Sequence, residues 1–220
     1  MSSIKPILFN TEMTIAVEKN RKTQTRRLVR FPSGRIEGKI PDPDRIHLEH
    51  VSGEHAFFKI EPFYRVRIKS PYKVGDILYV RETWGDYREC QDDGEGHYYL
   101  YRAVYPNGAT TYQYPGGPVC DLPKWHPSIH MPKEAARIFL RVTDMRVERL
   151  QEITDEGAKA EGANNRIGVS DKMRETAIQR FQRIWDRTIK PADLSIYGWA
   201  ANPWVWVYSF ERCEKPEEWK

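Results

Sequence analysis

The chain has 220 residues, of which 40% are apolar and 30% are charged, and its formal net charge is +4. This length suits one domain with a sizeable core, and an aromatic content of 12% argues against a disordered chain. No apolar run approaches the roughly 20 residues of a membrane helix, and the N-terminal segment is too highly charged for a signal peptide. Three cysteines without C-x-x-C spacing (Cys90, Cys120 and Cys213) disfavour a disulfide framework or a zinc ribbon. We therefore expect a globular protein of the cytoplasm.

The first quarter of the chain predicts a short helix followed by a basic loop. Thr11 can cap a helix over residues 12–20, which carries an apolar stripe. Residues 19–30 hold six cations and no acid, and we expect them to form a loop or turn. Such a run is more often solvated surface than a binding site, but its interleaved threonines favour contact with an anion or a polar ligand. Prolines and glycines make residues 31–55 resemble irregular surface.

The rest of the chain predicts strands interrupted by two helices. Alternating or β-prone residues predict strands over 64–69, 77–81, 97–105, 138–147 and 204–210. Thr154 caps one predicted helix over residues 155–162, and Asp171 caps a longer one that ends near Asp186. Short strands with a few helices indicate an α+β fold, a small closed or nearly closed β-barrel with flanking helices. We expect a single domain over residues 1–220, with a long loop-rich insertion at about 85–131.

The most informative segment is the sequence RKTQTRR, at residues 21–27. Lys22 lies three residues before Thr25, so its amine can lie near the threonine hydroxyl on a helical turn or a tight loop. A hydroxyl nucleophile needs a base within hydrogen-bond reach. Lysine can serve as that base if burial and neighbouring cations lower its pKa toward neutrality. The alternative is that Lys22 and the arginines face solvent and that Thr25 is a cap or turn residue.

The pattern R-K-T-x-T-x-R, followed by K-x-G-D-x-L-x-V at residues 73–80, resembles the signature of ASCH domains, a branch of the PUA-like β-barrels. The segment TDEGAKAEG at residues 154–162 also has a counterpart in that family. The chain is about twice as long as the compact bacterial members of the family. Its VRETW, WHPSIHMP and NPWVWV segments make it similar to the longer ASCH proteins of phages and prophages, which have no settled activity.

The resemblance implies a function and a set of site residues. Compact ASCH proteins are amidohydrolases that remove the acetyl group of N4-acetylcytidine by means of a lysine, a threonine and a glutamate. By motif these correspond to Lys22, Thr25 and Glu161, with Glu156 as a possible substitute for the glutamate. We expect no cofactor. We assign substrate contacts to Arg21, Arg26, Arg27, Glu82, Trp84 and His130.

Several of these assignments have competing interpretations. Glu82 ends a predicted strand, where it can be a pocket residue or form an ion pair at the barrel rim. His126 and His130 have i, i+4 spacing downstream of Cys120, but they lack the H-E-x-x-H pattern, so we expect no metal and place them on a loop near the barrel mouth. The alternating aromatic residues near the C-terminus, which include Trp204, fit a barrel core better than a stacking platform.

The sequence is compatible with two classes of function, which differ in the molecule that the chain binds. The first is an amidohydrolase acting on a modified nucleoside such as N4-acetylcytidine. The second is an RNA- or nucleotide-binding PUA-like module without amidase activity, with ribonuclease activity as a further variant. The two classes differ in how binding depends on salt. An RNA-binding module makes several phosphate contacts, so its affinity should fall steeply as the salt concentration rises. The sequence does not reveal the oligomeric state.

Overall fold

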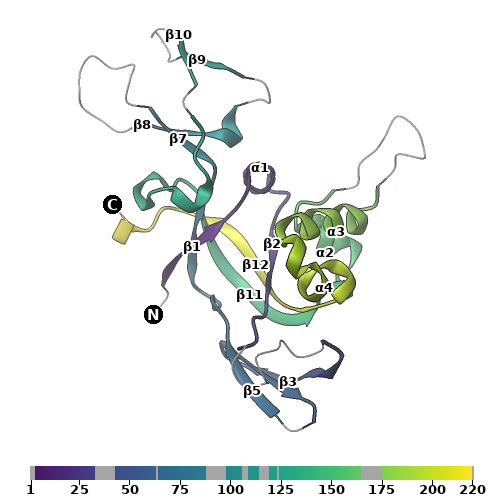
Figure 1. Ribbon diagram of the computed structural model, residues 1–220. Coiled ribbons are helices and arrows are strands. Elements are labelled where there is room, and N and C mark those ends of the chain that lie inside the picture. The colour runs from purple at the N-terminus through teal and green to yellow at the C-terminus, as the bar shows by residue number, and fades with distance from the viewer. Residues whose placement is uncertain are drawn as a thin grey trace. The chain divides into compact units, whose positions relative to one another are not determined.

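The computed structural model describes residues 3–32, 43–62, 64–87, 98–105, 109–113, 119–122, 124–164 and 175–219. The fold is α+β: strands in several sheets dominate, with a few short helices (Figure 1). The chain divides into two compact units, each discontinuous in sequence. Unit 1 comprises residues 1–20, 77–140 and 212–220, and unit 2 comprises residues 21–76 and 141–211.

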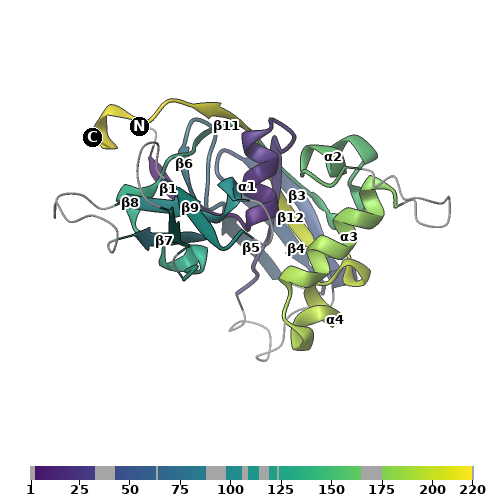
Figure 2. The same cartoon turned by 90° about the horizontal axis from the view of Figure 1, so that it is seen from above.

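Unit 1 is built from short strands around an apolar cluster. Its elements are β1 (Ile4–Leu8), α1 (Thr11–Glu18), β6 (Ile77–Arg81), β7 (Trp84–Tyr87), β8 (Tyr98–Tyr101), β9 (Thr111–Gln113) and β10 (Val119–Asp121). Strands β1 and β6, labelled in Figure 2, pair in parallel. Strand β7 pairs with β8, and β9 with β10, in antiparallel fashion. Met131, Phe139 and Trp219 are buried together in this unit. Aromatic burial of this kind stabilises a small unit strongly, because each large ring removes much apolar surface from water.

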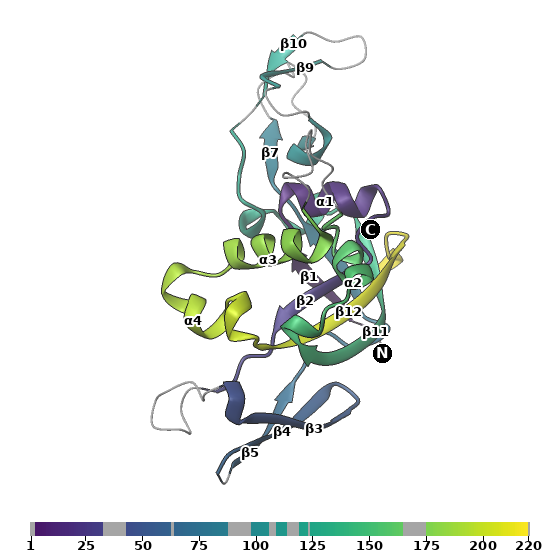
Figure 3. The same cartoon turned by 90° about the vertical axis from the view of Figure 1, so that its right-hand side faces the viewer.

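Unit 2 holds a sheet with helices on one face. The strands β11 (Phe139–Arg149), β12 (Trp204–Cys213) and β2 (Gln24–Leu28) are hydrogen-bonded in that order, and the unit boundary crosses β11 and β12 near one end of each. Figures 1 and 3 show α2 (Asp155–Ala160), α3 (Ala177–Thr188) and α4 (Leu194–Tyr197) beside this sheet. The apolar side chains of α3 explain this placement, because Phe181 and Trp185 pack in one cluster with Val205 and Val207 of β12.

A second sheet of unit 2 is an antiparallel meander. It consists of β3 (Ile46–Ser52), β4 (His55–Ile60) and β5 (Tyr64–Lys69), in that order. One of its faces is apolar, with Ile46, Ala56, Phe58 and Ile60 almost completely buried. Trp204 of β12 contacts this face through Phe58, at a ring separation of 5.6 Å. The meander is therefore an amphipathic sheet, whose other face carries polar side chains apart from Phe57.

The structure confirms several predicted elements and corrects others. The strands predicted over 64–69, 77–81, 138–147 and 204–210 are present as β5, β6, β11 and β12, and Thr154 caps α2 as expected. The prediction of a loop over residues 19–30 is wrong, because residues 24–28 form β2. Residues 46–52, expected to be irregular, form β3, and β4 begins at His55.

The helix ends and the sheet closure also differ from expectation. Asn10, and not Thr11, caps α1 by accepting a hydrogen bond from Met13. Helix α3 begins at Ala177 with Thr176 as its cap, and Asp171 lies outside the described residues. The expected strand over 97–105 is shorter, because a 3-10 helix follows Tyr101. Among the described residues, no sheet closes on itself to form the expected barrel.

Candidate functional site

Lys22 lies in the interior of unit 2, where its ammonium group is fully engaged. Only 2% of the residue is exposed, and its backbone forms an isolated antiparallel bridge with Glu161. The Lys22 Nζ donates hydrogen bonds to the Glu161 carboxylate at 2.5 Å, to the Gln24 carbonyl at 2.8 Å and to the Glu161 carbonyl at 3.1 Å. Three such bonds use all three N–H groups of an ammonium. Lys22 is therefore held in a single position between β2 and the end of α2.

Glu161 is positioned by the way in which α2 ends. Gly162 adopts a positive φ of 89°, which glycine reaches without steric cost. The Gly162 N–H donates to the Lys159 carbonyl, and the Ala163 N–H donates to the Ala158 carbonyl. These two bonds form a Schellman motif, whose buried alanines Ala158 and Ala163 anchor the turn. The turn fixes Glu161 as the C-terminal cap of the helix, next to Lys22.

Arg26 extends the network to a second carboxylate. Its Nε and Nη2 donate to Glu148 Oε1 at 2.9 and 2.6 Å, and its Nη1 donates to Glu161 Oε1 at 3.3 Å. Only 1% of the Arg26 side chain is exposed. Gly157 of α2 makes room for this guanidinium, because a Cβ at that position would lie 3.2 Å from Arg26 Nη2. The outer oxygen of Glu148 accepts from Arg146 at 3.0 Å.

Alternation along β2 places neighbouring residues on opposite faces of the sheet. Arg26 lies opposite Val207 and 5.8 Å from the Phe181 ring, so it faces the helices. Thr25 lies opposite Tyr208, and Arg27 lies opposite Trp206, so these two residues share the other face. Thr25 is 3% exposed. The basic segment thus divides its functional groups between two surfaces.

A group of hydroxyls lies on the Thr25 face. The Tyr208 and Ser70 hydroxyls are 2.6 Å apart, and Ser70 also donates to the Tyr72 carbonyl at 2.5 Å. The Tyr72 ring packs edge-on against Tyr208, with centroids 5.1 Å apart. Burial raises the pKa of both phenols, and the positive charge of Arg27 opposes that rise in each. Both phenols therefore remain neutral hydrogen-bonding groups beside a cation.

The electrostatics of Lys22 are dominated by burial. Loss of hydration lowers the pKa of its amine, and the neighbouring Arg27 and Arg26 lower it further. The Glu161 carboxylate opposes this shift by pairing with the ammonium. An amine with a lowered pKa can exchange its proton nearer to neutral pH than an exposed lysine can. A shift in this direction is one requirement for a lysine base.

The assigned residue Glu82 has an arginine partner in unit 1. It is 1% exposed and accepts two hydrogen bonds from Arg137, at 2.9 and 3.0 Å. Arg137 also donates to Glu18 at 2.5 Å, and it lies 4.4 Å from the Tyr101 ring centroid. Burial raises the pKa of Glu82, while the hydrogen bonds from Arg137 lower it.

The other assigned residues differ in exposure. Trp84 is half-buried in unit 1 between Tyr99 and His126, whose ring centroids lie 5.7 and 5.0 Å away. His130 is exposed at the end of a 3-10 helix over Ser128–His130. Arg21 and Glu156 are exposed in unit 2, so Glu161 is the glutamate that contacts Lys22. Among the described residues, no group of three or more His, Cys, Asp or Glu side chains could hold a metal ion.

Sequence reasoning missed two residues that contact predicted ones, Glu148 and Arg137. It also missed Ser70 and Tyr72, which contact Tyr208 on the Thr25 face. Glu148 and Tyr72 carry no motif of their own. Their contacts depend on pairing between strands far apart in sequence, such as the 122 residues that separate Arg26 from Glu148. The alternating pattern of β11 could have marked Glu148 as facing the same side as Arg146, but not its partner on β2.

Comparisons with known proteins identify no relative. No family model matches the chain, and neither curated proteins nor solved structures include a significant match. In the part of the chain that the structure describes, no helix combines the length and the apolar character needed to cross a membrane.

Proposed function

We propose that the chain is an amidohydrolase that removes the acyl group from an N4-acylated cytidine, on an ASCH-type PUA-like variant of the α+β fold. The observation that carries this proposal is the 2.5 Å contact between Lys22 Nζ and the Glu161 carboxylate, next to the strand that bears Thr25. The motif resemblance selects the same lysine, threonine and glutamate. Two independent considerations therefore favour the same pair of residues.

The first chemical step is acyl transfer to Thr25. Neutral Lys22 accepts the proton of the Thr25 hydroxyl as the Oγ forms a bond to the acyl carbonyl carbon. The lowered pKa of Lys22 supports this role, since a general base works best when its pKa lies near the working pH. Glu161 holds the amine in place and stabilises the ammonium that forms.

The second step releases the two products. The C–N bond breaks, the electron pair goes to the exocyclic nitrogen of the base, and the Lys22 ammonium returns the proton to that nitrogen. Water then attacks the threonyl ester, Lys22 accepts a proton from the water, and the C–O bond to Thr25 breaks to give the carboxylic acid and the free hydroxyl. Each proton passes through the amine of Lys22.

Arg27 and Arg26 have different roles in this proposal. Arg27 shares the face of Thr25, so its guanidinium is the group that we assign to the developing oxyanion. Arg26 lies on the opposite face between Glu148 and Glu161, and we assign it the task of positioning Glu161. The acyl carbonyl then approaches Thr25 from the face that Tyr208 shares.

Chromatography of N4-acetylcytidine after incubation with the purified protein tests the proposal. We expect cytidine and acetate from the wild type and a loss of about 1000-fold in Lys22→Arg, because a guanidinium keeps the charge but is not a base at neutral pH. The matched control is Lys19→Arg, an exposed lysine three residues earlier, which should act within about twofold of the wild type.

A second pair of variants separates chemistry from folding. Thr25→Val keeps the shape of the buried side chain and removes the hydroxyl, so it should abolish turnover, whereas Thr25→Ser should retain it. Thermal melting shows whether each variant is folded. A folded wild type without turnover would contradict the amidohydrolase proposal, and turnover by a folded Thr25→Val would exclude Thr25 as the nucleophile.

A further inference from the structure

The outer face of the β3–β4–β5 meander is a separate polar surface of unit 2. The register places nine residues on it, in three rows across the strands: His47, Lys59 and Arg65; His50, Phe57 and Arg67; and Ser52, His55 and Lys69. We call this surface the meander face. The proposed amidohydrolase chemistry uses none of these residues. Their function can therefore be tested independently.

A β-bulge brings two rings together at the centre of the meander face. The register of β3 against β4 shifts between Leu48 and His50, so that Glu49 is the extra residue. His50 consequently lies opposite Phe57, and the two rings stack with centroids 4.4 Å apart and planes 10° apart. Phe57 is only partly buried although it is strongly apolar. The middle row therefore offers an accessible π-surface.

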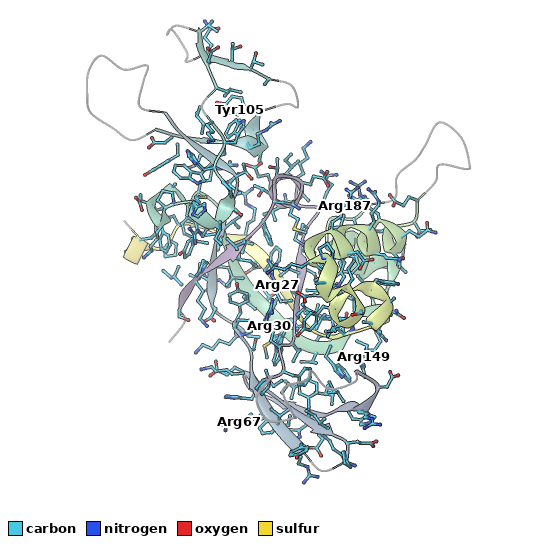
Figure 4. The ribbon with its side chains drawn as sticks, in the orientation of Figure 1. Arg27, Arg30, Arg67, Tyr105, Arg149 and Arg187 are labelled. Atoms are coloured by element: carbon cyan, nitrogen blue, oxygen red, sulfur yellow. The ribbon has the colours of Figure 1, made fainter. Side chains whose placement is uncertain are left out.

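Cations flank this pair of rings. Two of them have carboxylate partners, because Arg65 pairs with Glu49 at 2.9 Å and Lys69 pairs with Glu54 at 3.0 Å. Within the described ranges, Lys59 and Arg67 form no ion pair, so the meander face has an excess of positive charge. Arg67 is exposed on β5 (Figure 4), and the strand register pairs it with Phe57.

We propose that the meander face binds single-stranded RNA. Unpaired bases stack on aromatic rings and on arginine, whereas the bases of a duplex are already stacked on one another. Phe57 and His50 supply the rings, and Arg67 and Lys59 supply charge for phosphates. The third row adds the Ser52 hydroxyl and the His55 imidazole, which are suited to hydrogen bonding with the 2′-hydroxyl that distinguishes RNA from DNA.

Fluorescence anisotropy with a labelled 12-nucleotide oligouridylate tests this proposal. The comparison probes are the DNA strand of the same length, a 12-base-pair RNA duplex and a polyglutamate peptide. We expect the RNA strand to bind most tightly. If two cations contact phosphates, its affinity should fall about sevenfold between 50 and 200 mM salt, because each contact on a single strand contributes about −0.7 to the logarithmic slope.

Substitutions on the middle row locate the binding site. Phe57→Ala should weaken binding about tenfold through loss of stacking, and Phe57→Trp should preserve it. Arg67→Gln should reduce the salt slope by about 0.7, whereas Arg187→Gln, an exposed arginine of α3, should leave it unchanged (Figure 4). Because Arg67 is exposed, this variant should fold even if Phe57→Ala does not.

Four results would overturn the proposal. The first is that the folded wild type does not bind RNA, and the second is that Arg67→Gln keeps the wild-type affinity and salt slope. The third is that duplex RNA or polyglutamate binds as tightly as the RNA strand, and the last is that the DNA strand binds equally well. The last result would exclude recognition of the ribose, and the third would assign the meander face to a different class of partner. These results do not depend on whether the chain is an amidohydrolase, because the meander face contains none of the residues assigned to that activity.

Discussion

Each unit of the molecule contains a buried glutamate bound to a cation, but the two networks use different cations. In unit 2, Glu161 binds Lys22 and Arg26. In unit 1, Glu82 binds Arg137, which also pairs with Glu18. An arginine keeps its proton at every pH that proteins experience, whereas a buried lysine can lose one.

The identity of the cation, arginine in unit 1 and lysine in unit 2, decides whether the cation can release its proton. Burial lowers the pKa of Lys22, so its amine gives up a proton at lower pH than an exposed lysine does. Arg137 is held in place by two carboxylates and by the Tyr101 ring, and it offers no such step. The cation that accompanies a buried carboxylate therefore decides whether the cation itself can release a proton.

Removal of Arg26 should have the largest effect on stability. Arg26→Met removes the charge that lies between the buried Glu161 and the partly buried Glu148, each of which keeps one other cation as a partner. Breaking a buried ion pair from one side costs about 3–5 kcal/mol, so we expect a decrease of about 3 kcal/mol in the free energy of unfolding, measured by urea denaturation. The control is Arg146→Met, which removes the half-exposed partner of the same Glu148 and should cost at most about 1 kcal/mol. Equal losses would show that burial does not distinguish the two arginines.

The two networks should also respond to pH in opposite directions. The pKa of Lys22 is lowered in the folded state, so its contribution to stability increases as pH rises from that lowered pKa toward 10.5. The pKa of Glu82 is raised, so its contribution is complete below pH 4.5 and is lost as pH rises through the folded-state pKa. Stability measured against pH for Lys22→Met and Glu82→Gln, each relative to the wild type, checks both signs. A slope of the same sign in both difference curves would refute the comparison.

Buried tyrosine hydroxyls should have the smallest effects. Tyr101 donates to the Ala135 carbonyl at 2.6 Å, and burial raises its pKa to about 12, so it keeps its proton at neutral pH. Tyr101→Phe should cost about 1 kcal/mol, because it removes this bond and leaves the ring against Arg137. Tyr208→Phe, which removes the contact with Ser70, should cost about as much. Thermal melts of the two variants compare the units directly, and a cost above about 3 kcal/mol in either would contradict the single-bond interpretation.

Local patterns in the sequence predicted the strands that are rich in β-prone residues, and missed those specified by distant partners. Strands β11 and β12 contain many β-branched and aromatic residues, which give a direct signal in the sequence. The residues of β2 are QTRRL, which have no such pattern, and their strand conformation depends on pairing with β12. In β3, the bulge at Glu49 shifts the alternation halfway along the strand.

The site was only partly accessible from the sequence for a similar reason. The spacing of Lys22 and Thr25 is local, and the motif resemblance supplied Glu161. The contact between Lys22 and Glu161 joins residues 139 positions apart, and no local spacing encodes it. Thr25 and Arg26 lie on opposite faces because neighbouring residues of a strand alternate. This arrangement could not be predicted while the segment was expected to be a loop.

The position of β2 at the end of its sheet in unit 2 has a consequence for self-association. An outermost strand exposes backbone groups to which a strand of another molecule can bind. At the start of β2 these groups are already occupied: Thr23 donates to Ala160, and the Gln24 carbonyl accepts from the side chain of Lys22. The lysine that we assign to catalysis therefore also occupies a backbone acceptor that an added strand would need.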